Sequence, residues 1–340
     1  MPRALILDCE GARPTADEKA LYRDADPWGF ILFARHCPSA DDVAALCAEL
    51  RESVGRDAPI LIDQEGGRVV RMKPPVFPEH PSPATFGRLW KLDPKKAVEA
   101  ARLNAMLLGR MCSGLGVNIN CAPMLDVPQQ DSDKVVIGDR AIATHVDQVI
   151  ALGRAVMEGL IDGGVLPVIK HMPGHGRATI DSHYGLPHIV ASKRDLRETD
   201  FPPFRALSDA PIGMTAHIVY EAYDRDQCGT MSRTIIDDVI RGEIGFDGLL
   251  VTDDLKMKAL GGPVGERVTR SLAAGADIAC CCNFSLAEMV EAADAAPLLS
   301  GKSLERAQKA LAAAPKPALR ADSLRDYERL AGLIKPALVG

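Results

Sequence analysis

The sequence is poor in aromatic residues and contains no long apolar run. Only 4% of the 340 residues are aromatic, and no stretch approaches the ~18 consecutive apolar residues that a membrane span needs. The apolar stretch at residues 4–7 is followed by Asp8 and Glu10, so it is too short for the core of a secretion signal. We therefore expect a cytoplasmic protein that does not associate with a membrane.

An excess of positive charge is also absent. The formal net charge is -6, so nothing in the composition attracts nucleic acid or an anionic membrane. Nine cysteines occur without paired spacing, and three of them are consecutive at 280–282. We interpret them as small buried side chains in a reducing compartment, and expect neither disulfides nor a metal site. The composition, 47% hydrophobic and 25% charged, is that of a globular protein with a large core.

Eight short apolar segments alternate with segments of helical period along most of the chain. Their lengths and compositions are typical of buried parallel strands. The predicted strands are residues 3–9, 29–33, 59–62, 116–121, 165–169, 212–215, 248–251 and 277–281. The predicted helices are residues 39–50, 93–111, 144–160, 192–207, 235–241, 266–274, 286–293, 303–314 and 322–335. Repeated strand-then-helix units predict an α/β fold, a single (β/α)8 TIM-type barrel domain over residues 1–340. A doubly wound sheet, the alternative, normally has fewer strands and a glycine-rich phosphate turn after the first, which residues 8–11 lack.

Residues 165–189 carry the highest concentration of titratable groups. We expect the strand to end at Ile169 and a long loop to begin at Lys170, because the proline and glycines at 173–176 exclude a helix. Three histidines, one lysine and one aspartate lie on this stretch. Loops held by a rigid sheet often bind or catalyse, so we interpret this loop as part of a functional site.

Polar residues follow most of the predicted strands. In a (β/α)8 barrel the carboxyl ends of all strands converge on one face, where active sites lie. The polar residues at these ends are Asp63, Glu65, Arg68, Arg71, Asn118, Asn120, Asp126, Lys170, His171, His217, Asp253, Asp254 and Asn283. Such a set suits a small, heavily hydroxylated ligand, because charged side chains make charge-assisted hydrogen bonds to hydroxyl groups.

Glycoside hydrolysis at such a rim requires two groups, a proton donor for the leaving oxygen and a nucleophile or base at the anomeric carbon. Asp253 is a candidate nucleophile because an aspartate at a strand end is ionised at pH 7. His183 is a candidate acid and base because imidazole titrates near neutral pH. Asp181, two residues earlier, is placed to orient that imidazole and support its charged form.

These residues occur in motifs that resemble those of a known family. The motifs are K-H-x-P-G-H-G with D-S-H (170–183), I-L-F-A-R (31–35), D-Q-E-G-G-R-V-x-R (63–71), A-P-M-L-D-V (122–127), I-G-D-R (137–140), A-H (216–217), G-F-D-G (245–248) and D-D-L-x-M (253–257). Together they span most of the chain, and they resemble the family 3 glycoside hydrolases. In particular they are similar to the single-domain bacterial β-N-acetylglucosaminidases of peptidoglycan recycling.

The resemblance implies a retaining exo-β-N-acetylglucosaminidase that releases terminal N-acetylglucosamine (GlcNAc) from cell-wall muropeptides of the GlcNAc-anhydroMurNAc type. It implies that Asp253 forms a covalent glycosyl intermediate and that His183 is the acid/base, assisted by Asp181. Five further residues would hold the sugar: Asp63, Arg71, Arg140, Lys170 and His171. The resemblance implies no metal and no organic cofactor. The expected partner is the small carbohydrate substrate, and we expect a monomer.

Several rival functions stay open at this point. A β-N-acetylglucosaminide phosphorylase is one, because a histidine acid/base tolerates an incoming phosphate better than a carboxylate would; another family 3 β-glycosidase is a second. A metal-dependent barrel hydrolase would need a His-x-His pair after the first strand, where residues 8–10 read Asp-Cys-Glu. A sugar-binding or regulatory protein without catalytic activity would not need a complete set of nucleophile, acid/base and orienting carboxylate.

Four nearby features have competing interpretations. His217 is equally compatible with a hydrogen-bonded buried histidine and with a site residue. Asp254 is interpreted as structural, and the pair Gly66-Gly67 as a tight turn. Of His171 and His175, we expect one to bind sugar and the other to tie the loop internally.

Overall fold

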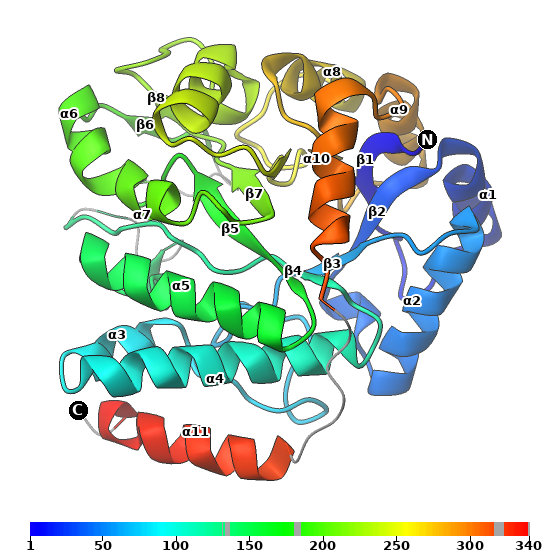
Figure 1. Cartoon of the computed structure of the whole chain (residues 1–340). Coiled ribbons are helices and arrows are strands. Elements are labelled where there is room, and N and C mark those ends of the chain that lie inside the picture. Colours follow the sequence, from blue (N-terminus) through cyan, green and yellow to red (C-terminus); the bar gives the residue numbers. More distant parts are fainter. Residues whose placement is uncertain (131, 133–136, 180–184, 316–322, 339–340) are drawn as a thin grey trace.

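The computed structural model describes residues 1–130, 132, 137–179, 185–315 and 323–338. Eight parallel strands lie at the centre, surrounded by helices (Figure 1). The strands are β1 (Arg3–Leu7), β2 (Pro27–Leu32), β3 (Ile60–Ile62), β4 (Ile119–Asn120), β5 (Leu166–Met172), β7 (Ile212–Thr215), β9 (Leu249–Val251) and β10 (Ala279–Cys280). Each overlaps one of the eight predicted strands, and all except β7 differ from the prediction at one end or both. The short pair β6 (His188–Ile189) and β8 (Val219–Tyr220) lies outside this sheet and was not predicted.

The sheet closes into a barrel. Its strands are hydrogen-bonded in the order β10-β1-β2-β3-β4-β5-β7-β9. A parallel bridge between Val251 and Ile278, with the Thr252 N–H donating to the Ile278 carbonyl at 3.0 Å, joins the last strand of that order to the first. A closed parallel sheet with helices outside it is the (β/α)8 architecture. The predicted fold class is confirmed, and the doubly wound sheet is excluded.

Most of the helices around the barrel lie where the sequence predicts them. They are α1 (Ala16–Ala25), α2 (Ala40–Val54), α3 (Ala84–Trp90), α4 (Pro94–Ser113), α5 (Val146–Asp162), α6 (Lys193–Asp195), α7 (Phe201–Ala206), α8 (Val264–Ala274), α9 (Leu286–Ala295), α10 (Gly301–Ala312) and α11 (Ser323–Leu338). A π-helix, Leu196–Asp200, connects α6 to α7, and another spans Ile235–Glu243. Across the described residues, no helix combines the length and the apolar character needed to cross a bilayer.

Two helices, α1 and α3, were not predicted. The start of α1 nevertheless has a local signal: the Thr15 hydroxyl accepts a hydrogen bond from the Glu18 N–H at 3.2 Å, and the Glu18 carboxylate accepts one from the Thr15 N–H at 2.6 Å. This reciprocal cap is the one that a Thr-x-x-Glu sequence favours. Helix α3 has only seven residues, too few to show a helical period.

Strand alternation divides the core into two layers. In β1, Ala4 and Ile6 face the barrel interior, whereas Leu5 and Leu7 pack toward the surrounding helices. Side chains of successive strand residues point to opposite faces, so each strand supplies both layers. All nine cysteines are buried and free. Their interpretation as small core side chains is therefore confirmed.

Helix α10 covers the amino-terminal end of the barrel and lies across the strands in Figure 1. Leu304 and Leu311 pack against the interior cluster. The Ser303 hydroxyl donates to Asp277, just before β10, at 2.7 Å. The apolar face of α10 therefore closes this end of the barrel, and the opposite end, where the strands finish, is the one that holds the polar residues.

Strand β5 extends beyond its predicted end at Ile169. The Lys170 N–H donates to the Pro123 carbonyl at 3.2 Å, and the Lys170 carbonyl accepts from Leu125 at 2.8 Å, so backbone pairing continues. The expectation that the loop begins at Lys170 is wrong, and the strand ends at Met172. A charged residue remains in the strand because two carboxylates balance its ammonium group.

The packing of α4 against α5 requires close backbone approach. A Cβ atom on Gly159 would lie 2.3 Å from the Arg102 carbonyl oxygen and 2.8 Å from the Ala105 Cβ. Both distances are far below normal contact, so a side chain at this position would force the helices apart. Gly332 in α11 is exposed, and no atom lies within 4 Å of the corresponding Cβ position.

We therefore expect Gly159→Ala to lower the free energy of unfolding by ~1–3 kcal/mol, the usual cost of overpacking. Gly332→Ala is the matched control, and should raise it by up to ~1 kcal/mol because alanine favours the helix. Urea denaturation followed by circular dichroism measures both. Equal effects of the two substitutions would contradict the close packing of α4 and α5.

Candidate active site

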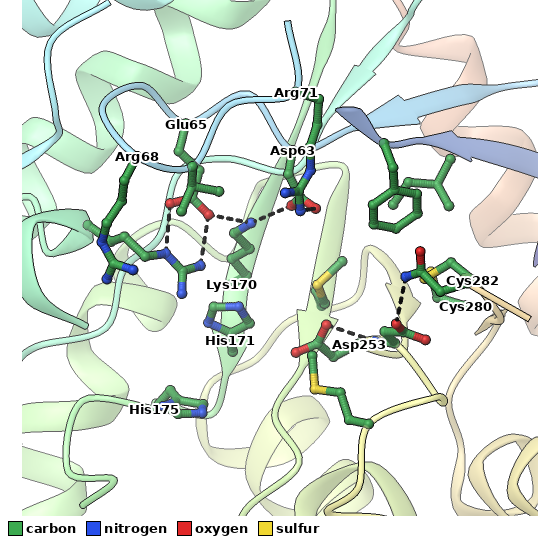
Figure 2. A pocket seen from close by; sticks show the side chains of 18 residues that line it. Asp63, Glu65, Arg68, Arg71, Lys170, His171, His175, Asp253, Cys280 and Cys282 are labelled. Carbon is green, nitrogen blue, oxygen red and sulfur yellow. Dashed lines mark hydrogen bonds and ion pairs between the residues drawn. The ribbon is translucent and has the colours of Figure 1, made fainter. Parts of the chain in front are cut away.

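A cavity of about 310 Å³ opens where the barrel strands end (Figure 2). This volume is at the small end of the range for ligand sites, so it suits a small ligand. The residues that line it are Ile31, Phe33, Asp63, Glu65, Arg68, Val69, Arg71, Arg140, Lys170, His171, His175, Met214, Asp253, Asp254, Met257, Cys280, Cys282 and Asn283. They come from the ends of β2, β3, β5, β7, β9 and β10 and from the segments that follow, and Arg140 comes from the segment after β4.

One wall of the cavity is a chain of alternating charges. The Lys170 ammonium lies 2.8 Å from Asp63 Oδ1 and 2.7 Å from Glu65 Oε1. Arg71 Nη2 lies 2.9 Å from the other oxygen of Asp63. Arg140 pairs with both oxygens of Glu65, at 3.0 and 2.8 Å. Each carboxylate therefore lies between two cations, as the dashed lines in Figure 2 show.

This arrangement keeps buried groups ionised. Burial would raise the pKa of Glu65, but Arg140 and Lys170 lower it to about 2. Burial likewise opposes ionisation of Asp63, yet Lys170 and Arg71 hold the pKa of that carboxyl well below its usual value. Burial would lower the pKa of Lys170, and Asp63 and Glu65 raise it instead. All three groups are charged at neutral pH.

A glycine turn after β3 brings Arg71 back to the cavity. Gly66 and Gly67 have φ values of 101° and 57°, a left-handed backbone that glycine adopts without strain. The Gln64 side-chain oxygen then accepts hydrogen bonds from the Arg71 N–H at 2.8 Å and the Met72 N–H at 3.1 Å. The structure confirms the predicted tight turn and shows that it positions Arg71.

Asp126 ties together the two histidines that precede and follow the end of β5. Its Oδ2 lies 2.8 Å from His171 Nδ1, and its Oδ1 accepts from the His175 N–H at 2.6 Å. Both rings line the cavity, with centroids 5.5 Å apart. Burial lowers the pKa of His175 to about 4, so its ring is neutral at pH 7. Asp126 therefore holds the ring of His171 and the backbone of His175, and which of the two histidines binds sugar stays a prediction.

Asp253 follows β9 and faces the charged wall across the cavity (Figure 2). Its Oδ1 accepts a hydrogen bond from the Asp254 N–H at 2.8 Å. Burial would raise the pKa of Asp253, but His171, His217 and the Asp254 N–H lower it below its usual value. The carboxylate is therefore ionised at neutral pH, as the sequence predicts.

The two residues with open interpretations near Asp253 are now explained. His217 is buried, with Nδ1 2.7 Å from the Thr230 hydroxyl and Nε2 3.0 Å from the Asp254 carbonyl oxygen. It is a hydrogen-bonded buried histidine that does not line the cavity. Asp254 accepts from the Lys256 N–H at 2.8 Å and so closes the turn after β9. Burial raises the pKa of Asp254 to about 6.

The structure brings together every predicted site residue that it describes. These residues are Asp63, Arg71, Arg140, Lys170, His171 and Asp253, and all line one cavity. His183 and Asp181 lie outside the described residues, so their position relative to Asp253 stays a prediction.

Two residues of the site, Glu65 and Asp126, were not among the predicted site residues. Each lies in a motif that the sequence shows, D-Q-E-G-G-R for Glu65 and A-P-M-L-D-V for Asp126. The motifs give their place at the rim. They do not give the contact of Glu65 with Lys170 and Arg140, or that of Asp126 with His171, because those partners are distant in sequence.

Comparisons with known proteins agree with this geometry. The family described as Glycosyl hydrolase family 3 N terminal domain matches residues 6–312. A β-hexosaminidase of Thiobacillus denitrificans is 36% identical over 285 residues, covering 82% of this chain and 78% of that protein. A β-hexosaminidase of Pseudomonas aeruginosa is 32% identical over 286 residues, covering 83% of each.

Solved structures give the same result. The crystal structure of NagZ from Neisseria gonorrhoeae in complex with N-trifluoroacetyl-D-glucosamine superposes with a TM-score of 0.88, with 29% identity and 99% of each chain covered. A glycoside hydrolase family 3 β-N-acetylglucosaminidase from Paenibacillus sp. superposes with a TM-score of 0.84 and 28% identity, covering 98% of this chain and 66% of that one.

The charged wall predicts how stability depends on pH. The pKa of Glu65 is lowered from 4.5 to about 2 by folding, so its contribution is complete above pH 4.5 and is lost as the pH falls toward 2. We expect Glu65→Gln to lower the free energy of unfolding at pH 7 by ~3 kcal/mol or more, because the buried Lys170 and the half-buried Arg140 lose their shared partner. Between pH 4.5 and 3 the variant should lose stability less steeply than the wild type.

Denaturant titrations from pH 7 to pH 3 measure both effects. Glu158→Gln is the matched control, because Glu158 forms an exposed ion pair with Arg102 at 2.9 Å. That substitution should change stability by less than ~1 kcal/mol. If the free energy of unfolding of Glu65→Gln fell between pH 4.5 and 3 as steeply as that of the wild type, the role of Glu65 would be contradicted.

Proposed function

The chain belongs to glycosyl hydrolase family 3 and is a glycoside hydrolase, and we propose that it is a retaining exo-β-N-acetylglucosaminidase. One observation carries the proposal most directly: an ionised carboxylate, Asp253, lies across a small cavity from a wall of fixed charges. The similarity to β-hexosaminidases and to NagZ supports N-acetylglucosamine as the sugar.

In this mechanism Asp253 attacks the anomeric carbon and forms a covalent glycosyl intermediate. The Asp254 N–H holds one of its oxygens at 2.8 Å and fixes the direction of the carboxylate. Among the described residues, the other oxygen accepts no hydrogen bond, so it is available for attack. A nucleophile that is already ionised and oriented needs little reorganisation during the reaction.

The second group is the acid/base, and we assign this role to His183 with Asp181 as its orienting partner. The support is in the sequence: the D-S-H motif places a carboxylate two residues before the imidazole. The histidine would protonate the leaving oxygen in the first step. It would then remove a proton from the water that hydrolyses the intermediate.

The charged wall binds the sugar hydroxyl groups in this proposal. Asp63 and Arg71 have the more accessible side chains, 17% and 28% exposed, whereas Lys170 is only 2% exposed. Asp63 and Arg71 would therefore make the larger contacts, and Lys170 holds Asp63 in place while offering its one remaining N–H donor. Arg140 and His171 line the same cavity and complete the binding set. Groups fixed by one another in this way are preorganised for a polar ligand.

We extend the proposal to the biological substrate. The resemblance of the sequence motifs to those of the bacterial β-N-acetylglucosaminidases of peptidoglycan recycling supports a GlcNAc-anhydroMurNAc muropeptide as the substrate, and peptidoglycan recycling as the process. The nine free, buried cysteines support a reducing compartment such as the cytoplasm. We propose that the chain acts there as a single barrel domain and as a monomer.

A panel of aryl β-glycosides with and without the 2-acetamido group tests the function. We expect turnover of the aryl N-acetyl-β-glucosaminide to exceed that of the aryl β-glucoside by roughly 10²-fold or more, because a site built for a polar group rejects the analogue that lacks it. The first sugar released should be the β anomer, seen by NMR. Preferred cleavage of the glucoside would indicate another β-glycosidase, and sugar 1-phosphate formed in phosphate buffer would indicate a phosphorylase.

Two variants test the division of roles. His183→Ala should lose ~10²-fold or more on natural glycosides, because the leaving oxygen needs a proton. It should keep most of the first-step rate on aryl glycosides with activated phenol leaving groups, which need none. Asp253→Asn is the comparison and should lose turnover of both substrates. Pre-steady-state release of the phenol measures the first step, and equal losses on both substrates in His183→Ala would exclude it as the acid.

A further inference from the structure

Two thiols lie next to one another in the wall of the cavity. Along the extended chain at β10, the side chains of Cys280 and Cys282 point inward and that of Cys281 points outward, as strand alternation requires. Cys280 and Cys282 belong to the barrel interior, whereas Cys281 packs in the layer between strands and helices. The first two line the cavity, and Figure 2 shows them at its edge.

The separation of the two sulfur atoms favours a bridging atom over a disulfide. Cys280 Sγ and Cys282 Sγ are 3.9 Å apart, whereas a disulfide needs roughly 2.05 Å. Residues two apart in a strand have Cα atoms roughly 6.5 Å apart, near the upper limit for a disulfide. A single atom bonded to each sulfur at roughly 2.3 Å, the length of a zinc–thiolate bond, spans the observed gap without movement of the backbone.

The surroundings of the pair restrict which ligand it takes. Among the described residues, no set of three or more His, Cys, Asp or Glu side chains could hold a metal ion. Burial raises the pKa of Cys282 well above its ordinary value, so this thiol is neutral. A suitable ligand must therefore react with neutral thiols and be satisfied by two sulfur atoms.

We propose that Cys280 and Cys282 form a dithiol site that binds trivalent arsenic compounds of the type R–As=O. Two As–S bonds form, the two thiol hydrogens leave with the oxygen as one water molecule, and arsenic stays trivalent. The step needs no oxidant or reductant. Cys280 and Cys282 line the same cavity as Asp253 and Asp63, so a group bound there lies among the residues to which we assign sugar binding and attack. Occupancy of the site should exclude the sugar.

Phenylarsine oxide is the probe, and intact-protein mass spectrometry is the primary measurement. We expect one phenylarsine group per chain, which 2,3-dimercaptopropanol removes and an excess of 2-mercaptoethanol does not. Cys280→Ala and Cys282→Ala should each weaken the adduct by roughly 10²-fold or more, because the second As–S bond is an intramolecular step with a high effective concentration. Cys281→Ala is the matched control and should keep the wild-type adduct. Mass spectrometry of the adduct needs no turnover, so its result does not depend on the proposed glycosidase activity.

The wild-type protein provides a test that does not depend on the folding of any variant. Excess N-acetylglucosamine should slow formation of the adduct, and fragmentation of the tryptic peptide 271–302 should place arsenic on Cys280 and Cys282. The proposal would be overturned by an adduct that survives in both single variants, by one that disappears in Cys281→Ala, or by one that maps to any cysteine other than Cys280 and Cys282. Adduct formation that is unaffected by N-acetylglucosamine, at a concentration that inhibits turnover, would overturn its place in the cavity.

Discussion

The buried ammonium group of Lys170, between Asp63 and Glu65, is the interaction on which the rest of the site depends. It links the end of β5 to the segment after β3, and through the two carboxylates it fixes Arg71 and Arg140. Replacement of a buried ion network by apolar side chains is often neutral or stabilising. The network is therefore better explained by what it positions than by what it contributes to stability: charged groups that a small polar ligand meets in a fixed arrangement.

The wall of the cavity that holds Asp253, opposite the charged wall, has different chemistry. Asp253 is held by one backbone N–H, and its charge is supported by His171 from the other side of the cavity. Beside it the wall is formed by the sulfur-containing side chains of Met214, Met257, Cys280 and Cys282. A wall of paired charges therefore faces a carboxylate set among soft, apolar groups. This division suits a ring that is polar at its edge and reacts at one carbon.

The barrel explains why residues so distant in sequence can cooperate. Asp63, Lys170 and Asp253 follow or end β3, β5 and β9, and parallel strands bring their carboxyl ends to one rim. Helix α10 closes the other end with apolar side chains. The cavity therefore lies at the carboxyl ends of the strands. The segments that follow the strands there, such as the turn at Gly66 and Gly67, can change conformation without disturbing the sheet.

The sequence by itself determined the eight strands, their closure into one architecture and the rim position of Asp63, Lys170 and Asp253, because short apolar segments and the polar residues after them are local patterns. The tertiary structure alone decided the length of β5, where Lys170 stays in the strand because Asp63 and Glu65 balance its charge. It also decided that Asp126 holds His171, that His217 is a hydrogen-bonded buried residue, and that Cys280 and Cys282 share one wall. The contacts of Lys170 and His171 depend on distances between residues that are far apart in the chain. Which cysteine side chains point into the barrel depends on the register of the strand within the sheet. No local pattern contains that information.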